Sequence, residues 1–251
     1  MENEIVGEVI EASTIEFRAE SRELHSPPAF GCFVRVSVGA QSSVPSSPVA
    51  SPQSVVDDDP FESSDSFGTF RQASGGFGRA YREIIEGESS PDCPGLDPAI
   101  FGIVCGASTG PVDSSRKLRA FWKDEDQMQE DHPEISEWLL VTHFNAMIIG
   151  HTCNGAVQHL LPPQPPKLFS QVRACTDDEI RLITRKMDFL RTIVNSHQAP
   201  AEEVIAACIL RAYEAYDGDF NFLVAAGKEL ASLMKDDYDR LQAIIRRVSP
   251  W

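Results

Sequence analysis

The sequence predicts an α+β protein in which a small N-terminal β-barrel, interrupted by a long disordered insertion, precedes a C-terminal helical bundle. Short β-branched or alternating apolar runs occupy residues 5–36 and return at 100–105 and 146–149. A stretch rich in Ser, Pro and Gly separates these strand-like segments. After residue 175 the apolar residues recur every three or four positions, which is the period of an amphipathic helix.

The first strands are predicted between residues 5 and 36. Residues 5–10 form a β-branched run, and residues 14–18 alternate between apolar and polar side chains. Only residues 11–13 separate the two runs, so we expect a hairpin. Two prolines, Pro27 and Pro28, then interrupt the chain before a third strand over residues 31–36.

A disordered insertion is predicted at about residues 39–78. This segment is rich in Ser, Pro, Gly and Asp and has few aliphatic residues. It cannot bury enough apolar surface to offset the entropy of ordering its backbone. Its phenylalanines fit either a short docking motif or scattered aromatics in a tether; they are Phe61, Phe67, Phe70 and Phe77.

The second part of the barrel is predicted from residue 100 onward. Residues 100–105 form an apolar strand that we expect to end at Gly106, and the dipeptide Gly110-Pro111 indicates a turn. We expect a helix to begin near Asp131 and to carry residues 134–142. A buried strand should follow at residues 146–149.

The proline-rich run over residues 162–166 marks the predicted domain boundary. Residues 1–161 are assigned to the barrel with its insertion, and residues 162–251 to a final strand and the helical bundle. Thr176 and Glu179 have the spacing of a capping box, which begins a helix carrying apolar residues through Val194.

Three further helical stripes follow, and each should be buried against a neighbour. The first begins at Pro200, the second begins after Gly218, and the third runs from Tyr238. The second stripe consists of Phe220, Leu223, Gly227, Leu230 and Met234, and the third continues with Leu241, Ile244, Ile245 and Val248.

Composition limits the classes of function. The chain has 251 residues, 42% of them hydrophobic, and a formal net charge of −16. Extensive nucleic-acid binding needs clustered Lys and Arg, so we expect none. No apolar run approaches the roughly 18 residues of a membrane span, and no signal peptide is apparent, which predicts a soluble cytoplasmic protein without membrane contact.

The six cysteines are scattered singly, which favours reduced thiols.

Two separated blocks of the sequence resemble a known family. The pattern IVGEVIEASTIEFRAES followed by FGCFVRV resembles the opening of a HAS-barrel, the N-terminal barrel of HerA-like DNA-translocating ATPases and of rotary ATP synthase catalytic subunits. Residues 101–104, 107–110, 132–135 and 144–151 are similar to later barrel segments, so the resemblance covers about half of the chain. It implies a HAS-like barrel that packs beside neighbouring barrels in a collar above a motor ring.

The chain lacks the nucleotide-binding motif of those ATPases. A P-loop has the pattern G-x-x-x-x-G-K-[ST], and the only Gly-Lys pair here is Gly227-Lys228, inside a predicted helix. The resemblance therefore implies a barrel without the ATPase domain. We expect no catalytic residue, no bound cofactor and no enzymatic activity.

Metal ligands are present, but not in a recognised pattern. His151, Cys153 and His159 are of the right type for zinc, yet their spacing matches no common structural site and a fourth ligand is not evident. Whether they bind metal is left open. The acidic runs at residues 57–59 and 124–126 are interpreted as solvated loop charge.

These observations predict a noncatalytic adaptor that associates through its barrel with a HerA-like hexameric ATPase in DNA processing or repair, within a ring-shaped assembly. Two alternatives remain: a metal-dependent hydrolase or nuclease with unrecognised carboxylates, and a ligand-binding barrel with a deep pocket. The candidate partner-interface residues, which could instead be core, are Ile15, Phe17, Phe33, Val34, Phe101 and Trp138.

Overall fold

The computed structural model describes residues 4–38, 97–113, 115, 117–118, 120–122, 124–132, 139–197 and 199–248. The insertion predicted at residues 39–78 and the interface candidate Trp138 lie outside the described residues. The strands are β1 (Ile5–Ala12), β2 (Glu16–Ser21), β3 (Phe33–Ser37), β4 (Ala99–Pro111), β5 (Leu140–Cys153), β6 (Ala156–Gln158) and β7 (Gln171–Ala174). The helices are α2 (Glu125–Asp131), α3 (Asp177–Thr184), α4 (Phe189–Val194), α5 (Ala201–Ala215), α6 (Phe220–Leu233) and α7 (Tyr238–Val248).

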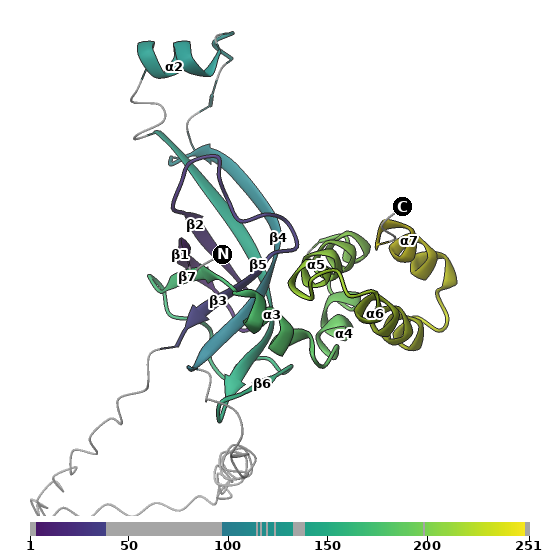
Figure 1. The fold of residues 1–251 in the computed structure, drawn as a ribbon. Coiled ribbons are helices and arrows are strands. Elements are labelled where there is room, and N and C mark those ends of the chain that lie inside the picture. The colour runs from purple at the N-terminus through teal and green to yellow at the C-terminus, as the bar shows by residue number, and fades with distance from the viewer. Residues whose placement is uncertain are drawn as a thin grey trace, which may run out of the picture. The chain divides into compact units, whose positions relative to one another are not determined.

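Six antiparallel strands form a closed barrel in the order β2-β1-β7-β3-β4-β5, with β5 pairing back onto β2 (Figure 1). The closing register places Glu16 opposite Met147 and Glu20 opposite His143. Strand β6 adds to β5 as a short hairpin. The predicted β1–β2 hairpin is confirmed. The sequence prediction of an α+β fold with an N-terminal barrel is therefore confirmed.

Strand β7 completes the barrel although it follows the proline-rich run. It lies between β1 and β3, with Val172 opposite both Gly7 and Val36. A division at residue 161 thus separates one barrel strand from the other five. The described barrel and helices belong to one compact unit.

The barrel interior is filled by side chains from all six of its strands. Alternate residues of each strand point inward, because successive side chains of a strand lie on opposite faces. The two phenylalanines Phe17 and Phe144 are the largest of them. This inner core consists of Val9, Phe17, Ala19, Val34, Val36, Ile100, Val104, Phe144, Ala146, Ile148 and Val172.

A second core joins the outside of the barrel to the helices. Phe101 and Ile103 of β4 belong to this outer core, whereas Ile100 and Val104 of the same strand belong to the inner one. Phe33 of β3 meets Phe189 of α4 edge-on, with 6.1 Å between ring centroids. Because β4 is buried on both faces, its sequence is a continuous apolar run rather than an alternating one.

Several predictions between residues 106 and 142 are wrong. Strand β4 does not end at Gly106, and the described helix α2 ends, rather than begins, at Asp131. Gly110 and Pro111 do not form a turn, because β4 continues through them and pairs with Val141 and Leu140. Thr142 lies in β5 rather than in a helix, and its Oγ1 is 2.8 Å from Oγ1 of Thr109 on β4. The partner strand satisfies the backbone of this segment and overrides the local turn and helix signals.

The helix predicted from the capping box through Val194 is two helices, α3 and α4. The break places Phe189, Leu190 and Ile193 of α4 in the outer core. The helices predicted after Pro200, after Gly218 and from Tyr238 are confirmed as α5, α6 and α7. Helix α5 contacts each of α3, α4, α6 and α7.

Candidate interaction surfaces

Four of the predicted interface residues are core residues. Phe17 and Val34 lie inside the barrel, whereas Phe33 and Phe101 lie between the barrel and the helices. All four are at most 2% exposed, so none of them can offer its side chain to a partner in this structure. Ile15, in the β1–β2 turn, is 49% exposed and is the described member of the set that remains available.

The three candidate zinc ligands do not form a metal site. Nδ1 of His151 lies 3.0 Å from the carbonyl oxygen of Leu160. The His159 ring lies against Phe189, and burial lowers the pKa of His159. Among the described residues, no group of three His, Cys, Asp or Glu side chains is close enough to hold a metal ion.

A capping box begins α3, and an ion pair from the same glutamate anchors the helix to the barrel. The Thr176 hydroxyl accepts a hydrogen bond from the Glu179 backbone N–H, and the Glu179 carboxylate accepts one from the Thr176 N–H at 2.9 Å. The predicted capping box of Thr176 and Glu179 is therefore confirmed. The Glu179 carboxylate also forms an ion pair with Arg35 of β3, and both side chains are nearly buried. The only sequence signal for this ion pair is a single cation in an otherwise apolar strand.

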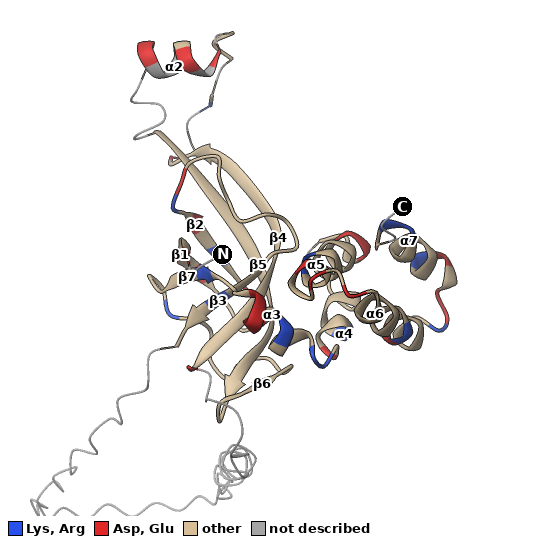
Figure 2. Ribbon diagram, viewed as in Figure 1, with Lys and Arg blue, Asp and Glu red and all other residues tan. Residues whose placement is uncertain are grey.

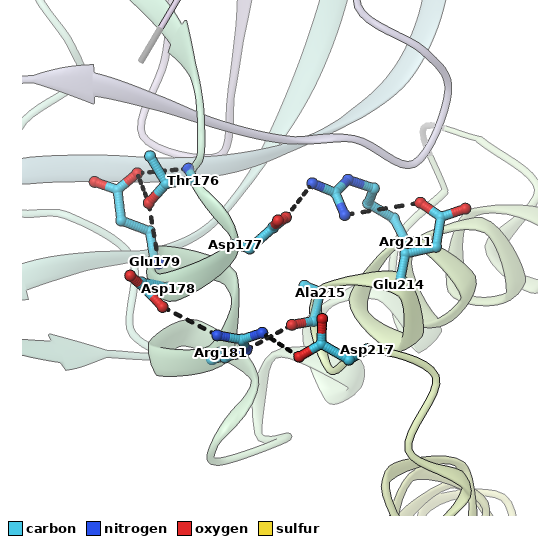
Figure 3. Close-up of polar contacts among 9 residues, drawn as sticks. All are labelled: Thr176, Asp177, Asp178, Glu179, Arg181, Arg211, Glu214, Ala215 and Asp217. Atoms are coloured by element: carbon cyan, nitrogen blue, oxygen red, sulfur yellow. Dashed lines mark hydrogen bonds and ion pairs between the residues drawn. The ribbon is translucent and has the colours of Figure 1, made fainter. Parts of the chain in front are cut away.

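A group of charged residues joins α3 to the C-terminal end of α5 (Figure 3). Arg211 donates to the Asp177 carboxylate at 2.6 Å. Arg181 donates to Asp217 at 2.8 Å and through Nε to the carbonyl oxygen of Ala215 at 2.5 Å. The hydrogen bond from Arg211 lowers the pKa of the Asp177 carboxyl. These contacts join α3 to α5 at the surface, beside the apolar core that the two helices share.

The β4–β5 hairpin extends beyond the barrel. Residues 109–111 of β4 and 140–142 of β5 pair only with each other among the described strands. The connection between them carries Trp122, which is 95% exposed and has a φ of 58°, a region that bulky residues rarely adopt. Helix α2, in the same connection, carries acidic residues (Figure 2).

An apolar groove of about 220 Å³ lies among α5, α6 and α7. Its exposed members include Phe220 and Val224 of α6, which are 54% and 40% exposed. An ion pair between Arg247 of α7 and Glu203 of α5, at 2.6 Å, orients α7 against α5. The groove is lined by Ile209, Phe220, Leu223, Val224, Ala226, Gly227, Leu230, Ile244, Ile245 and Val248.

No protein-family model and no curated protein matches this chain. The described helices include none with the length and apolar character needed to cross a bilayer.

Proposed function

We propose that this chain is a noncatalytic adaptor that assembles with a HerA-like hexameric ATPase in DNA processing or repair. The resemblance to HAS-barrels of residues 5–36, and of short segments between residues 101 and 151, supports the choice of partner class. The closed barrel of six strands supports the proposal at the level of fold class. In this proposal the barrel is HAS-like and the C-terminal helices act as a helical bundle beside it.

The observation that carries the proposal is the filled interior of the barrel. Eleven buried side chains, contributed by all six strands, occupy the space in which a ligand-binding barrel would hold its ligand. Phe17 and Phe144 are at most 1% exposed. A barrel packed in this way has no internal space for a ligand, so any partner binds to its outer surface. The filled interior therefore favours an adaptor over the ligand-binding alternative.

Exposed aromatic residues supply surfaces for a partner. Trp122 follows β4, and Phe169 precedes β7 with 74% of its side chain exposed. Single exposed apolar side chains are common on protein surfaces, and these two are available for contact with a partner. The acidic chain, with a net charge of −16, favours a basic protein surface over nucleic acid as the direct partner.

Barrel closure changes the expected mode of assembly. A collar of neighbouring barrels was expected to use exposed sheet edges, but each of the six barrel strands is paired on both sides over part of its length. Contact between barrels in a ring would therefore run through loops and outer faces. In the described part of the chain, free strand edges occur at β6 and at the projecting ends of β4 and β5.

Sedimentation velocity with a purified HerA-like hexameric ATPase tests the adaptor function. We expect the chain to cosediment with the hexamer. The matched control is the same ATPase without its own N-terminal barrel, which should bind the chain weakly if barrels meet side by side. Independent sedimentation of the two proteins would contradict the proposal.

Activity assays on the chain alone test the enzyme alternative. An adaptor should release no phosphate from ATP and should leave DNA intact when Mg²⁺ or Mn²⁺ is added. Metal-dependent cleavage that EDTA abolishes would support the hydrolase or nuclease alternative instead.

A further inference from the structure

We propose that the side chain of Trp251 docks in the apolar groove among α5, α6 and α7, so that a segment of the chain itself fills this groove. Trp251 lies outside the described residues. Its docking involves this chain alone and is therefore independent of the proposed ATPase partner. The place where α7 ends, the apolar lining of the groove and the short sequence after α7 all favour this occupant.

The position of Val248 brings the residues that follow it to the groove. Val248 is the last residue of α7, and it is one of the residues that line the groove. Trp251 follows it by three positions. A chain spans at most about 3.3–3.6 Å per residue, so the Cα atoms of Val248 and Trp251 cannot be farther apart than roughly 11 Å. The Trp251 side chain can therefore reach the groove while α7 keeps its position.

Pro250 favours a change of chain direction beside the groove. Proline has no N–H to continue a helix, and it disfavours the helical conformation of the residue before it, which here is Ser249. Both effects agree with the end of α7 at Val248. A chain that leaves the helix at this point can turn its next large apolar side chain, Trp251, back onto the groove.

Three apolar side chains at the mouth of the groove remain partly exposed in the described part of the chain. Phe220 and Val224 of α6 are 54% and 40% exposed, and Ile245 of α7 is 45% exposed. Every residue that lines the groove is apolar or glycine. An aromatic ring laid over these side chains removes apolar surface from water on both sides of the contact. The indole N–H can face the solvent at the open side, so docking buries no unpaired donor.

The size of the groove and the short tether favour Trp251 over a separate molecule. The groove volume of about 220 Å³ lies below the range of roughly 300–1,000 Å³ typical of small-molecule sites, and its lining offers no polar side chain to orient a ligand. A side chain held by so short a linker acts at an effective concentration of the order of millimolar. A weak apolar contact is therefore enough to fill the groove, whereas a separate protein would have to displace the tethered ring.

Tryptophan fluorescence of the full chain tests the docking. The sequence has three tryptophans, Trp122, Trp138 and Trp251. The double variant Trp122→Phe with Trp138→Phe leaves Trp251 as the single tryptophan. Its emission should lie at a shorter wavelength in native buffer than in guanidinium chloride, and acrylamide should quench it less. Both properties should be independent of protein concentration, because the groove and its occupant belong to the same chain.

A matched pair of substitutions in the single-tryptophan variant shows where the ring is docked. Val224→Glu places a carboxylate in the groove, so it should bring the emission wavelength and the acrylamide quenching of Trp251 to those of the denatured chain. Leu182→Glu is the control, because Leu182 of α3 is 39% exposed, as Val224 nearly is, but does not line the groove. It should leave both properties unchanged. Thermal melting by circular dichroism checks that each variant is folded.

Three results would overturn the inference. The first is native emission and quenching equal to those of the denatured chain. The second is a short emission wavelength that persists in folded Val224→Glu, because Trp251 would then be buried elsewhere. The third is a change that appears only at higher protein concentration, because a second copy would then supply the occupant. None of these measurements involves the ATPase, so the docking and the proposed function can fail separately.

Discussion

The barrel and the α6–α7 pair use apolar residues in opposite ways. Strand β4 is covered on one face by the barrel interior and on the other by helices, so Phe101 is 1% exposed. Helix α6 has a comparable apolar stripe, yet Val224 in that stripe is 40% exposed. The difference shows that an apolar stripe becomes core only where a further element covers it, and otherwise becomes a surface available to a partner.

The sharpest way to test this comparison is to truncate one phenylalanine in each region. Phe101→Ala should lower the free energy of unfolding by about 3–5 kcal/mol because it leaves a cavity between the barrel and the helices. Phe220→Ala, at a side chain that is 54% exposed, should lower it by less than about 1 kcal/mol. Urea denaturation measures both; equal losses would contradict the distinction between core and surface.

The ion pair between Arg35 and Glu179 tests the attachment of the helices to the barrel. Arg35→Ala leaves a nearly buried carboxylate without its cation, which should destabilise the fold by about 3 kcal/mol. The double variant Arg35→Met with Glu179→Met should recover only part of that loss, because it removes both charges but also the capping hydrogen bond from the Thr176 N–H. A single variant as stable as the wild type would show that the pair does not hold α3 on β3. Denaturant titration provides the measurement.

Two glycines contrast a packed contact with an open one. Gly31 has a φ of 83°, and a Cβ there would lie 2.4 Å from Cβ of Ala207 on α5, so Gly31→Ala should destabilise the fold by about 1–3 kcal/mol. Gly227→Ala should stabilise it by roughly 0.5–1 kcal/mol. Melting temperatures of the two variants should shift in opposite directions. A destabilised Gly227→Ala protein would mean that the groove is closed.

The smallest effect is expected from the surface pair of Asp177 and Arg211. Arg211 lowers the pKa of Asp177 below its ordinary value of 3.8 in the folded state. The ion pair therefore stabilises the folded protein at neutral pH. It is lost as pH falls below that value through the folded pKa. Asp177 is 48% exposed at its side chain, so the contribution should be less than about 1 kcal/mol and should shrink with added salt.

The contribution of this ion pair to the free energy of unfolding is measured by denaturing the wild type and Asp177→Asn at pH 7 and at pH 3. The stability difference between the two proteins should be larger at pH 7. A difference that does not change with pH would show that the ion pair contributes nothing to stability.

Local sequence signals determined several elements of this protein. The run over residues 5–18 predicted the β1–β2 hairpin, because only a short polar connection separates its two halves. Thr176 and Glu179 predicted the start of α3, since a capping box is completed within one turn. The spacing of apolar residues also identified the stripes of α6 and α7 that line the candidate groove.

Only the tertiary structure decided which of these apolar surfaces are covered. Phe17 and Val224 belong to equally apolar patterns, but long-range strand pairing encloses the first, whereas the second faces an open groove. Arg35 and Glu179 are 144 positions apart, so no local pattern could indicate their contact. Likewise, pairing with Val141 keeps Gly110 in a strand despite its turn signal. The physical reason is that propensity acts between neighbours in sequence, whereas burial depends on distant segments that the folded chain brings together.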